Sequence, residues 1–315
     1  MAFPLLVNAG LLALPIAGTV GTLMGIDAHR LAMGQQPLFT SEIGNDGRDS
    51  HNGIVNTRYC DLFNPISPFS KGQSYTINPN QWGVTDDTTG GLCLNVTTIA
   101  NGSYPSATAA PKFSVTWQFD QASTDHTVHA FPNIMVNDVL PASVADIQHL
   151  NLDIHWTYAM GSKPANKTDE TELQDANVMT NVALDMFFDA DIKTATNVSR
   201  AKYEMMVWFA SFGDAKPFGY NDGIVRKKGL NGTTFELYTG QNDLGQEVLT
   251  WLAANTTETF DGDILPLITD LFSLGNDIDL SESDYLGVLS FGTEAFSSPS
   301  NVTFWMPESA IDVQV

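Results

Sequence analysis

Hydrophobic and polar residues alternate with a period of two in many short segments that follow residue 58. Clear examples are FSVTWQF at 113–119, NVALDMFF at 181–188 and YEMMVWFA at 203–210. The segments are rich in β-branched and aromatic residues, and Gly, Pro, Asn and Asp separate them, which is typical of strands joined by turns. Because no helices alternate with these strands, the pattern predicts an all-β sandwich or jelly roll.

One segment departs from the strand pattern and has helical spacing instead. Residues 261–275 read DGDILPLITDLFSLG, and four apolar side chains fall on one helical face: Ile264, Leu267, Ile268 and Leu271. Asp263 can cap this helix, Pro266 lies in the first turn where proline is tolerated, and Gly275 can end it. We therefore expect one α-helix, packed on the outside of a sheet.

The first 57 residues differ from the rest of the chain. Residues 1–26 contain no charged side chain, which predicts a signal peptide or a signal-anchor. As a helix this stretch would be about 39 Å long, enough to span a bilayer. Residues 27–57 are polar and contain Gly, Asn and Asp clusters, as in a flexible stalk or pro-segment. The functional domain is then expected at residues 58–315.

Charge and sequons indicate a protein that works outside the cell. Asp and Glu number 36 against 14 Lys and Arg, giving a formal net charge of −22. This charge excludes nucleic acid and anionic membrane surfaces as partners, but it does not repel an uncharged polymer. Seven N-x-Ser/Thr sequons favour the secretory route and N-glycans: Asn95, Asn101, Asn166, Asn197, Asn231, Asn255 and Asn301. We expect a secreted monomer, with membrane anchoring through residues 4–26 as the alternative.

The chain has two cysteines, Cys60 and Cys93. In an oxidising compartment they predict a disulfide. It would close a loop of about 33 residues and stabilise the fold by about 3–4 kcal/mol. The alternative is a pair of buried free thiols.

Three carboxylates stand in otherwise apolar strand segments: Asp185, Glu204 and Glu294. If the odd-numbered residues of 203–208 fill the sandwich interior, then Glu204, Met206 and Trp208 line the opposite, concave face. Asp185 takes the corresponding place in VALDMFFDA. For a single glutamate, an ordinary solvent-facing position is the alternative. Facing carboxyl groups in different environments are what glycoside hydrolysis needs, with one protonated and one ionised.

YEMMVW at 203–208, followed by FGTEAF at 291–296, resembles the corresponding segments of glycoside hydrolase family 12. Further segments match in order: RYCDLF, GGLCLNV, YTINPNQWG, VALDMFFDADI, KPFG and TFELYTG. This family contains β-1,4-endoglucanases and xyloglucan-specific endoglucanases. Its fold is a two-sheet antiparallel β-jelly roll, a concanavalin-like sandwich with a concave substrate cleft. The resemblance covers about residues 58–310.

The resemblance implies a retaining double displacement. Glu204 would be the nucleophile, Glu294 the general acid/base, and Asp185 a neighbour that hydrogen-bonds and tunes Glu204. In retaining enzymes the two catalytic carboxyl groups lie about 5–5.5 Å apart. Glu294 needs a raised pKa to begin protonated, and ionised Glu204 nearby supplies part of that rise. The implied activity is endo-cleavage of β-1,4-glucan or xyloglucan; the alternative is a glucan-binding or host-recognised protein of the same fold.

Sugar rings have apolar faces, so aromatic side chains with neighbouring amides are the expected contacts. We expect Trp82, Trp117 and Trp208 to be platforms, with Asn80 beside Trp82 and Met206 under the nucleophile. For each tryptophan, core packing is the alternative. The histidines lack metal-ligand spacing, so neither a metal nor another cofactor is expected. Residues 161–180 exceed the family core and form either a surface loop or a rim of the cleft.

Overall fold

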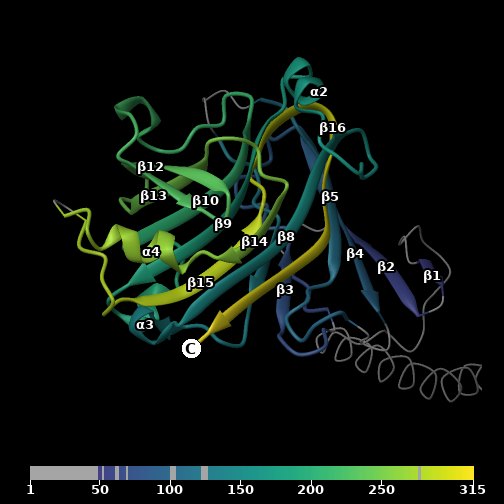
Figure 1. Cartoon of the computed structure of the whole chain (residues 1–315). Coiled ribbons are helices and arrows are strands. Elements are labelled where there is room, and N and C mark those ends of the chain that lie inside the picture. The colour runs from purple at the N-terminus through teal and green to yellow at the C-terminus, as the bar shows by residue number, and fades with distance from the viewer. Residues whose placement is uncertain are drawn as a thin grey trace, which may run out of the picture.

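The computed structural model describes two β-sheets packed face to face (Figure 1). The described residues are 49–51, 53–60, 64–68, 70–99, 104–121, 127–275 and 278–315. The signal or anchor expected in residues 1–26, and residues 27–48 of the expected stalk, lie outside them. None of the helices in these ranges has the length and hydrophobicity of a membrane span.

The first sheet contains the strands nearest the N-terminus. Its order is β1 (Asp49–His51), β2 (Ile54–Tyr59), β4 (Gly90–Ile99), β5 (Lys112–Phe119), β16 (Ala295–Gln314), β8 (His149–Met160) and β14 (Thr259–Asp263). β2 starts at Ile54, so this sheet begins within the segment expected to be a flexible stalk, before the expected boundary at residue 58. The predicted disulfide is confirmed, because Cys60, just after β2, is bonded to Cys93 in β4.

The second sheet carries the candidate carboxylates. Its order is β3 (Tyr75–Asn78), β6 (Asn133–Val136), β15 (Tyr285–Gly292), β9 (Met179–Asp189), β10 (Tyr203–Phe212), β13 (Glu247–Ala253), β12 (Thr233–Gln241) and β11 (Arg226–Leu230), with the short β7 (Ala142–Ser143) beside β15. β10 and β13 run parallel, unlike the antiparallel pairing expected throughout. The connection at 213–225 carries the chain back toward the start of β10, so β11 runs in the same direction as β10. β12 then runs the opposite way, and β13 runs in the direction of β10 again.

β16 joins the two sheets. Its first residues, Ala295 and Ser297, pair with β9 in the second sheet. From Val302 onward the strand pairs with β5 and β8 in the first sheet. In Figure 1 it is the long yellow strand that ends at the C-terminus. A single strand therefore fixes the position of one sheet relative to the other.

The predicted helix is present as α4 (Leu265–Leu271), and Leu267, Ile268 and Leu271 are fully buried, as is Ile264 at the N-cap position. The Asp263 carboxylate accepts from the backbone N–H of Leu265 at 2.9 Å. The described residues also contain α2 (Glu170–Asp175), α3 (Ile192–Ala195) and the short 3₁₀ turns η1 (Val144–Asp146) and η2 (Tyr220–Asp222), where a single helix was expected. α2 lies within the 161–180 insertion and buries Leu173, so part of that insertion is a packed helical turn.

Candidate active site

β10 places Glu204 on the face of the second sheet that points away from the core. Tyr203, Met205 and Val207 are buried between the two sheets. Met206 and Trp208 belong instead to a separate apolar cluster on the other face. Because side chains alternate along a strand, Glu204 shares this outer face with Met206 and Trp208, as the sequence predicted.

Asp185 lies on the same face, in the neighbouring strand β9. It stands directly across from Met206 in β10 and from Ser290 in β15. Asp185 is buried, and its Oδ1 atom has no hydrogen-bond partner among the described residues. A buried carboxyl oxygen without a donor makes the ionised form costly, so this position favours a protonated or shared carboxyl group.

The strand registers extend this arrangement into rows that cross seven strands. The row that contains Asp185 runs through Thr76, Met135, Ser290, Asp185, Met206, Thr250 and Tyr238. The next row runs through Asn78, Asn133, Gly292, Ala183, Trp208, Leu252 and Glu236. Six inter-strand spacings of about 4.8 Å give each row a length of about 29 Å. The carboxylates therefore lie near the middle of a long surface that an extended ligand can cross.

Glu294 lies in the turn between β15 and β16, where the side chain of Asn181 fixes it. Asn181 donates from Nδ2 to the Glu294 carboxylate, and its Oδ1 accepts from the Glu294 backbone N–H at 2.9 Å. The hydroxyl of Thr180 donates to the Glu294 backbone carbonyl at 2.6 Å. Since Asn181 belongs to β9, these bonds hold Glu294 over the strand that carries Asp185.

A buried hydroxyl network lies beneath the Glu294 turn. The Tyr158 hydroxyl accepts from the indole nitrogen of Trp117 at 2.8 Å. It also lies 3.1 Å from the Thr180 hydroxyl and 2.9 Å from the Thr293 hydroxyl. Trp117 is therefore a fully buried core residue at the far end of this network. The expectation that Trp117 is a sugar platform is wrong, because the inward face of β5 packs into the core.

The three carboxyl groups have different electrostatic environments. Burial, together with the charge of Glu204, raises the pKa of Glu294 to about 8, although the hydrogen bond from Asn181 opposes the rise. Burial and the charges of both glutamates raise the pKa of Asp185 well above its ordinary value. Burial also raises the pKa of Glu204, and a hydrogen bond from Asn242 opposes this rise. In weak acid, Glu294 is protonated and able to donate a proton.

Asn242 is a site residue that the sequence did not reveal. It lies between β12 and β13 and donates from Nδ2 to the Glu204 carboxylate at 2.9 Å. Its Oδ1 accepts from the backbone N–H groups of Leu244 and Gln246, which fixes its orientation. Asn181 was also missed, although its spacing of four residues from Asp185 places both on one face of a strand and could have revealed it. Asn242 reaches Glu204 only through the tertiary fold.

The remaining candidate sugar contacts fall into two groups. Trp82 is 59% exposed, so its ring is open to a ligand, and Asn80 beside it is half-buried. Met206 and Trp208 are buried, and the Trp208 indole nitrogen donates to the Met206 sulfur at 3.3 Å. Trp208 is therefore not the open platform that was expected. It packs beside Met206 and supports the sheet around Glu204.

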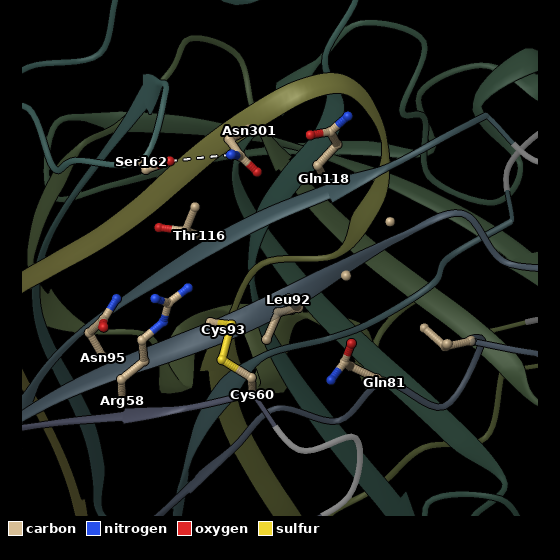
Figure 2. Close-up of a pocket in the computed structure, with 13 residues that line it drawn as sticks. Arg58, Cys60, Gln81, Leu92, Cys93, Asn95, Thr116, Gln118, Ser162 and Asn301 are labelled. Atoms are coloured by element: carbon tan, nitrogen blue, oxygen red, sulfur yellow. Dashed lines mark hydrogen bonds between the residues drawn. A yellow bond between two sulfur atoms is a disulfide. The ribbon is translucent and has the colours of Figure 1, made fainter. Parts of the chain in front are cut away.

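A cavity of about 650 Å³ lies over the outer face of β4 and β5 in the first sheet. Figure 2 shows the Cys60–Cys93 disulfide beside it and its polar lining residues, among them Arg58, Gln81, Asn95, Gln118 and Asn301. None of the three carboxylates lines this cavity, so it is separate from the site on the second sheet. Across the described ranges, no group of three or more His, Cys, Asp or Glu side chains is arranged to hold a metal ion.

Comparison with known families agrees with this geometry. The sequence model of glycosyl hydrolase family 12 matches residues 73–314, which is more than half of the chain. The chain belongs to glycosyl hydrolase family 12. The match includes Asp185, Glu204 and Glu294, and the family expected from YEMMVW and FGTEAF is confirmed.

Relatives of this family 12 hydrolase include proteins that are named as enzymes and one that is named as inactive. Xyloglucan-specific endo-β-1,4-glucanase A of Aspergillus niger is 27% identical over 233 residues, covering 74% of this chain and 83% of that protein. The inactive glycoside hydrolase XLP1 of Phytophthora nicotianae is 24% identical over 228 residues, covering 72% and 82%. The crystal structure of Trichoderma harzianum endoglucanase 3 has a TM-score of 0.64 at 20% identity, covering 84% of this chain and all of that one. This likeness confirms the predicted β-jelly roll.

Proposed function

We propose that this family 12 hydrolase is an extracellular endo-β-1,4-glucanase that acts on xyloglucan or a related β-1,4-glucan. The observation that carries the proposal is a group of three neighbouring carboxyl groups. Glu204 and Asp185 lie on one sheet face and Glu294 lies in the turn held over β9, where burial and the charge of Glu204 raise the pKa of Glu294 to about 8. Paired carboxyl groups of this kind are the machinery of glycoside hydrolysis. The relatives named as xyloglucan-specific support xyloglucan as the first substrate to test.

The mechanism is a retaining double displacement. Glu294 protonates the leaving glycosidic oxygen while Glu204 attacks the anomeric carbon and forms a glycosyl-enzyme. Glu294, now ionised, removes a proton from water, which attacks the same carbon and releases Glu204. Asp185 lies beside both glutamates, whose charges raise its pKa, and in this mechanism it tunes Glu204. Asn242 orients Glu204 by donating a hydrogen bond to its carboxylate. The reaction requires protonated Glu294, so its basic limit is near pH 8 in the free enzyme.

Charge and surface chemistry support an uncharged polysaccharide substrate outside the cell. The net charge of −22 does not repel a neutral glucan. Trp82, which follows β3 in the chain, offers an open ring for a sugar face. Five of the predicted sequon asparagines are exposed, as N-glycosylation requires: Asn166, Asn197, Asn231, Asn255 and Asn301. The protein is proposed to act as a secreted monomer.

The test measures release of reducing ends from xyloglucan and from unbranched mixed-linkage β-glucan at acidic pH. Wild type is compared with Glu204→Gln, which keeps the shape of the side chain and removes its negative charge. The matched control is Glu308→Gln, an exposed carboxylate in the part of β16 that pairs within the first sheet. We expect the Glu204 variant to lose hydrolysis and the control to keep it. Wild-type activity in Glu204→Gln would contradict the assignment.

A second candidate function is recognition of glucan without catalysis. The observation that favours this second function is the inactive relative XLP1, which is about as similar to this chain as some relatives that are named as enzymes. The same assay separates the two functions. A folded wild type that binds xyloglucan and releases no reducing ends would establish the binding function.

A further inference from the structure

The connection between β10 and β11 brings two exposed aromatic rings onto the face of the sheet that carries the carboxylates. Tyr220 stacks on Tyr238, with ring centroids 5.1 Å apart and planes 28° from parallel. Tyr238 is the last member of the row that begins at Thr76 and passes through Asp185 and Met206. Its neighbours in β12, Phe235 and Leu237, point into the core. Tyr220 therefore covers the end of this row on the same face as the candidate active site.

Phe218 lies beside Tyr220 and is held against β12 by two glycines. A Cβ at Gly240 would lie 2.8 Å from the Phe218 Cβ, and a Cβ at Gly219 would lie 1.9 Å from the Thr239 carbonyl oxygen. Only residues without side chains allow the turn to lie this close to the strand. Gly240 in β12 pairs with Val248 in β13, and Val248 pairs with Glu204 in β10. Because Phe218 lies against Gly240, it lies two strand spacings, or about 10 Å, from the strand that carries Glu204.

We propose that Phe218 and Tyr220 form a sugar-binding platform for the β-glucan chain on the face that carries the carboxylates, at the end opposite β3 and Trp82. Their side chains are 50% and 40% exposed, so the rings are available to a ligand. β3, which Trp82 follows, lies three strands from β9 on one side, and β12 lies three strands from β9 on the other. An enzyme that cuts within a polymer holds the chain on both sides of the cleaved bond. Two aromatic platforms flanking the central carboxylates meet that requirement.

The surroundings of the platform suit a neutral, hydroxylated ligand. Aromatic rings pack against the apolar faces of sugar rings, and polar neighbours bond to the hydroxyl groups at the edges. The Lys216 ammonium lies over the Tyr220 ring, 5.5 Å from its centre, and is half exposed. A sugar ring that stacks on Tyr220 takes the place of this contact, and the freed ammonium can donate to a sugar hydroxyl. The nearby Glu236 carboxylate is paired with Lys227 at 2.6 Å. The platform rests on the proposed function, because its ligand is the substrate of that reaction.

The test measures equilibrium binding by calorimetry in the Glu204→Gln background, so that the ligand is not consumed. The probes are xyloglucan oligosaccharides and cello-oligosaccharides. We expect Tyr220→Ala and Phe218→Ala each to raise the Kd about three- to tenfold. Tyr220→Phe should keep the wild-type Kd, because it keeps the ring. Ile54→Ala is the matched control, since Ile54 is similarly exposed but lies on the first sheet, and its Kd should not change.

In the active enzyme, Tyr220→Ala should raise KM for the polymer while kcat is retained, because the ring binds away from the cleaved bond. An unchanged Kd in Tyr220→Ala, alongside a raised Kd in Trp82→Ala, would overturn the platform and leave the proposed function standing. A dimer that dissociates on Tyr220→Ala with unchanged sugar affinity would also overturn it and assign these rings to a contact between copies. A wild type that neither binds nor cleaves either glucan would remove both proposals.

Discussion

Replacing Glu294 with glutamine should make the protein more stable than wild type in mild alkali. Burial and the Glu204 charge raise the pKa of Glu294 from 4.5 to about 8. The native state therefore holds a proton between pH 4.5 and pH 8 that the unfolded chain releases. The stability due to this proton is fully present below pH 4.5 and is lost as the pH rises to 8. Glutamine cannot ionise, but its side-chain oxygen still accepts from Asn181.

The size of the effect follows from the pKa difference. A difference of about 3.5 between 4.5 and 8 corresponds to about 5 kcal/mol at 1.36 kcal/mol per unit. This value is an upper limit, because Glu294 is partly exposed and titrates together with Asp185 and Glu204. The free energy of unfolding of Glu294→Gln, relative to wild type, should therefore increase by several kcal/mol between pH 4.5 and pH 8.

The assay is urea unfolding followed by tryptophan fluorescence, at constant ionic strength and at four values between pH 4 and pH 9. Glu236→Gln is the control, because it removes one negative charge from an ion pair on the same sheet face. The control should follow the wild-type dependence on pH, while Glu294→Gln should decline less steeply. Parallel curves for Glu294→Gln and wild type would show that burial does not keep Glu294 protonated. The assignment of Glu294 as the proton donor would then lose its physical basis.

Three further outcomes are expected. Asn181→Leu removes a hydrogen bond that lowers the pKa of Glu294, so the basic limb of the pH–activity profile should move to higher pH while kcat falls. Tyr158→Phe leaves the buried indole N–H of Trp117 without its acceptor, and Trp117→Phe removes one of the partners of the buried Tyr158 hydroxyl, so each should cost about 1–3 kcal/mol in urea unfolding. The double variant should cost less than the sum of the two. Replacing both bridging cysteines with alanine should lower the free energy of unfolding by about 3–4 kcal/mol, measured by thermal unfolding without reductant.

The part of the site that lies within single strands could be predicted from the sequence. The period-two pattern of YEMMVW places Glu204, Met206 and Trp208 on one face, and the structure buries the alternate residues in the core. The same argument applies to Asp185 in VALDMFFDA. These predictions hold because a strand in a two-sheet sandwich has one face against the core, which fixes the direction of each side chain.

Which face of a strand turns to the core, and which distant residues meet there, could not be predicted in the same way. Trp117 belongs to an alternating strand, but no local pattern says whether its face turns to the other sheet or to the ligand. The partner that places it in the core, Tyr158, lies 41 residues away. Asn242 meets Glu204 across 38 residues of sequence, through a turn whose position depends on the pairing of β12 with β13. Such contacts follow from topology, which local patterns do not specify.

The order and direction of the strands could likewise not be predicted from local patterns. Alternation predicts that β10 and β13 are strands, but it carries no information about their direction. They run parallel because the long 213–225 connection crosses back before β11. This crossing also brings Phe218 and Tyr220 onto the face of the candidate active site. The departure from the expected antiparallel pattern is thus what creates the second aromatic platform.

β16 has a consequence for how the protein is made. Its residues 295–314 are translated after all the strands with which they pair, and Met306 lies 193 residues after its partner Phe113 (306 − 113). Until that segment leaves the ribosome, β5 and β8 each lack a neighbour, and unpaired strand edges are sites of aggregation. Pairings this distant in sequence also form slowly. The nascent chain should therefore remain dependent on chaperones until residues 295–314 have left the ribosome, and its two sheets should associate only after that point.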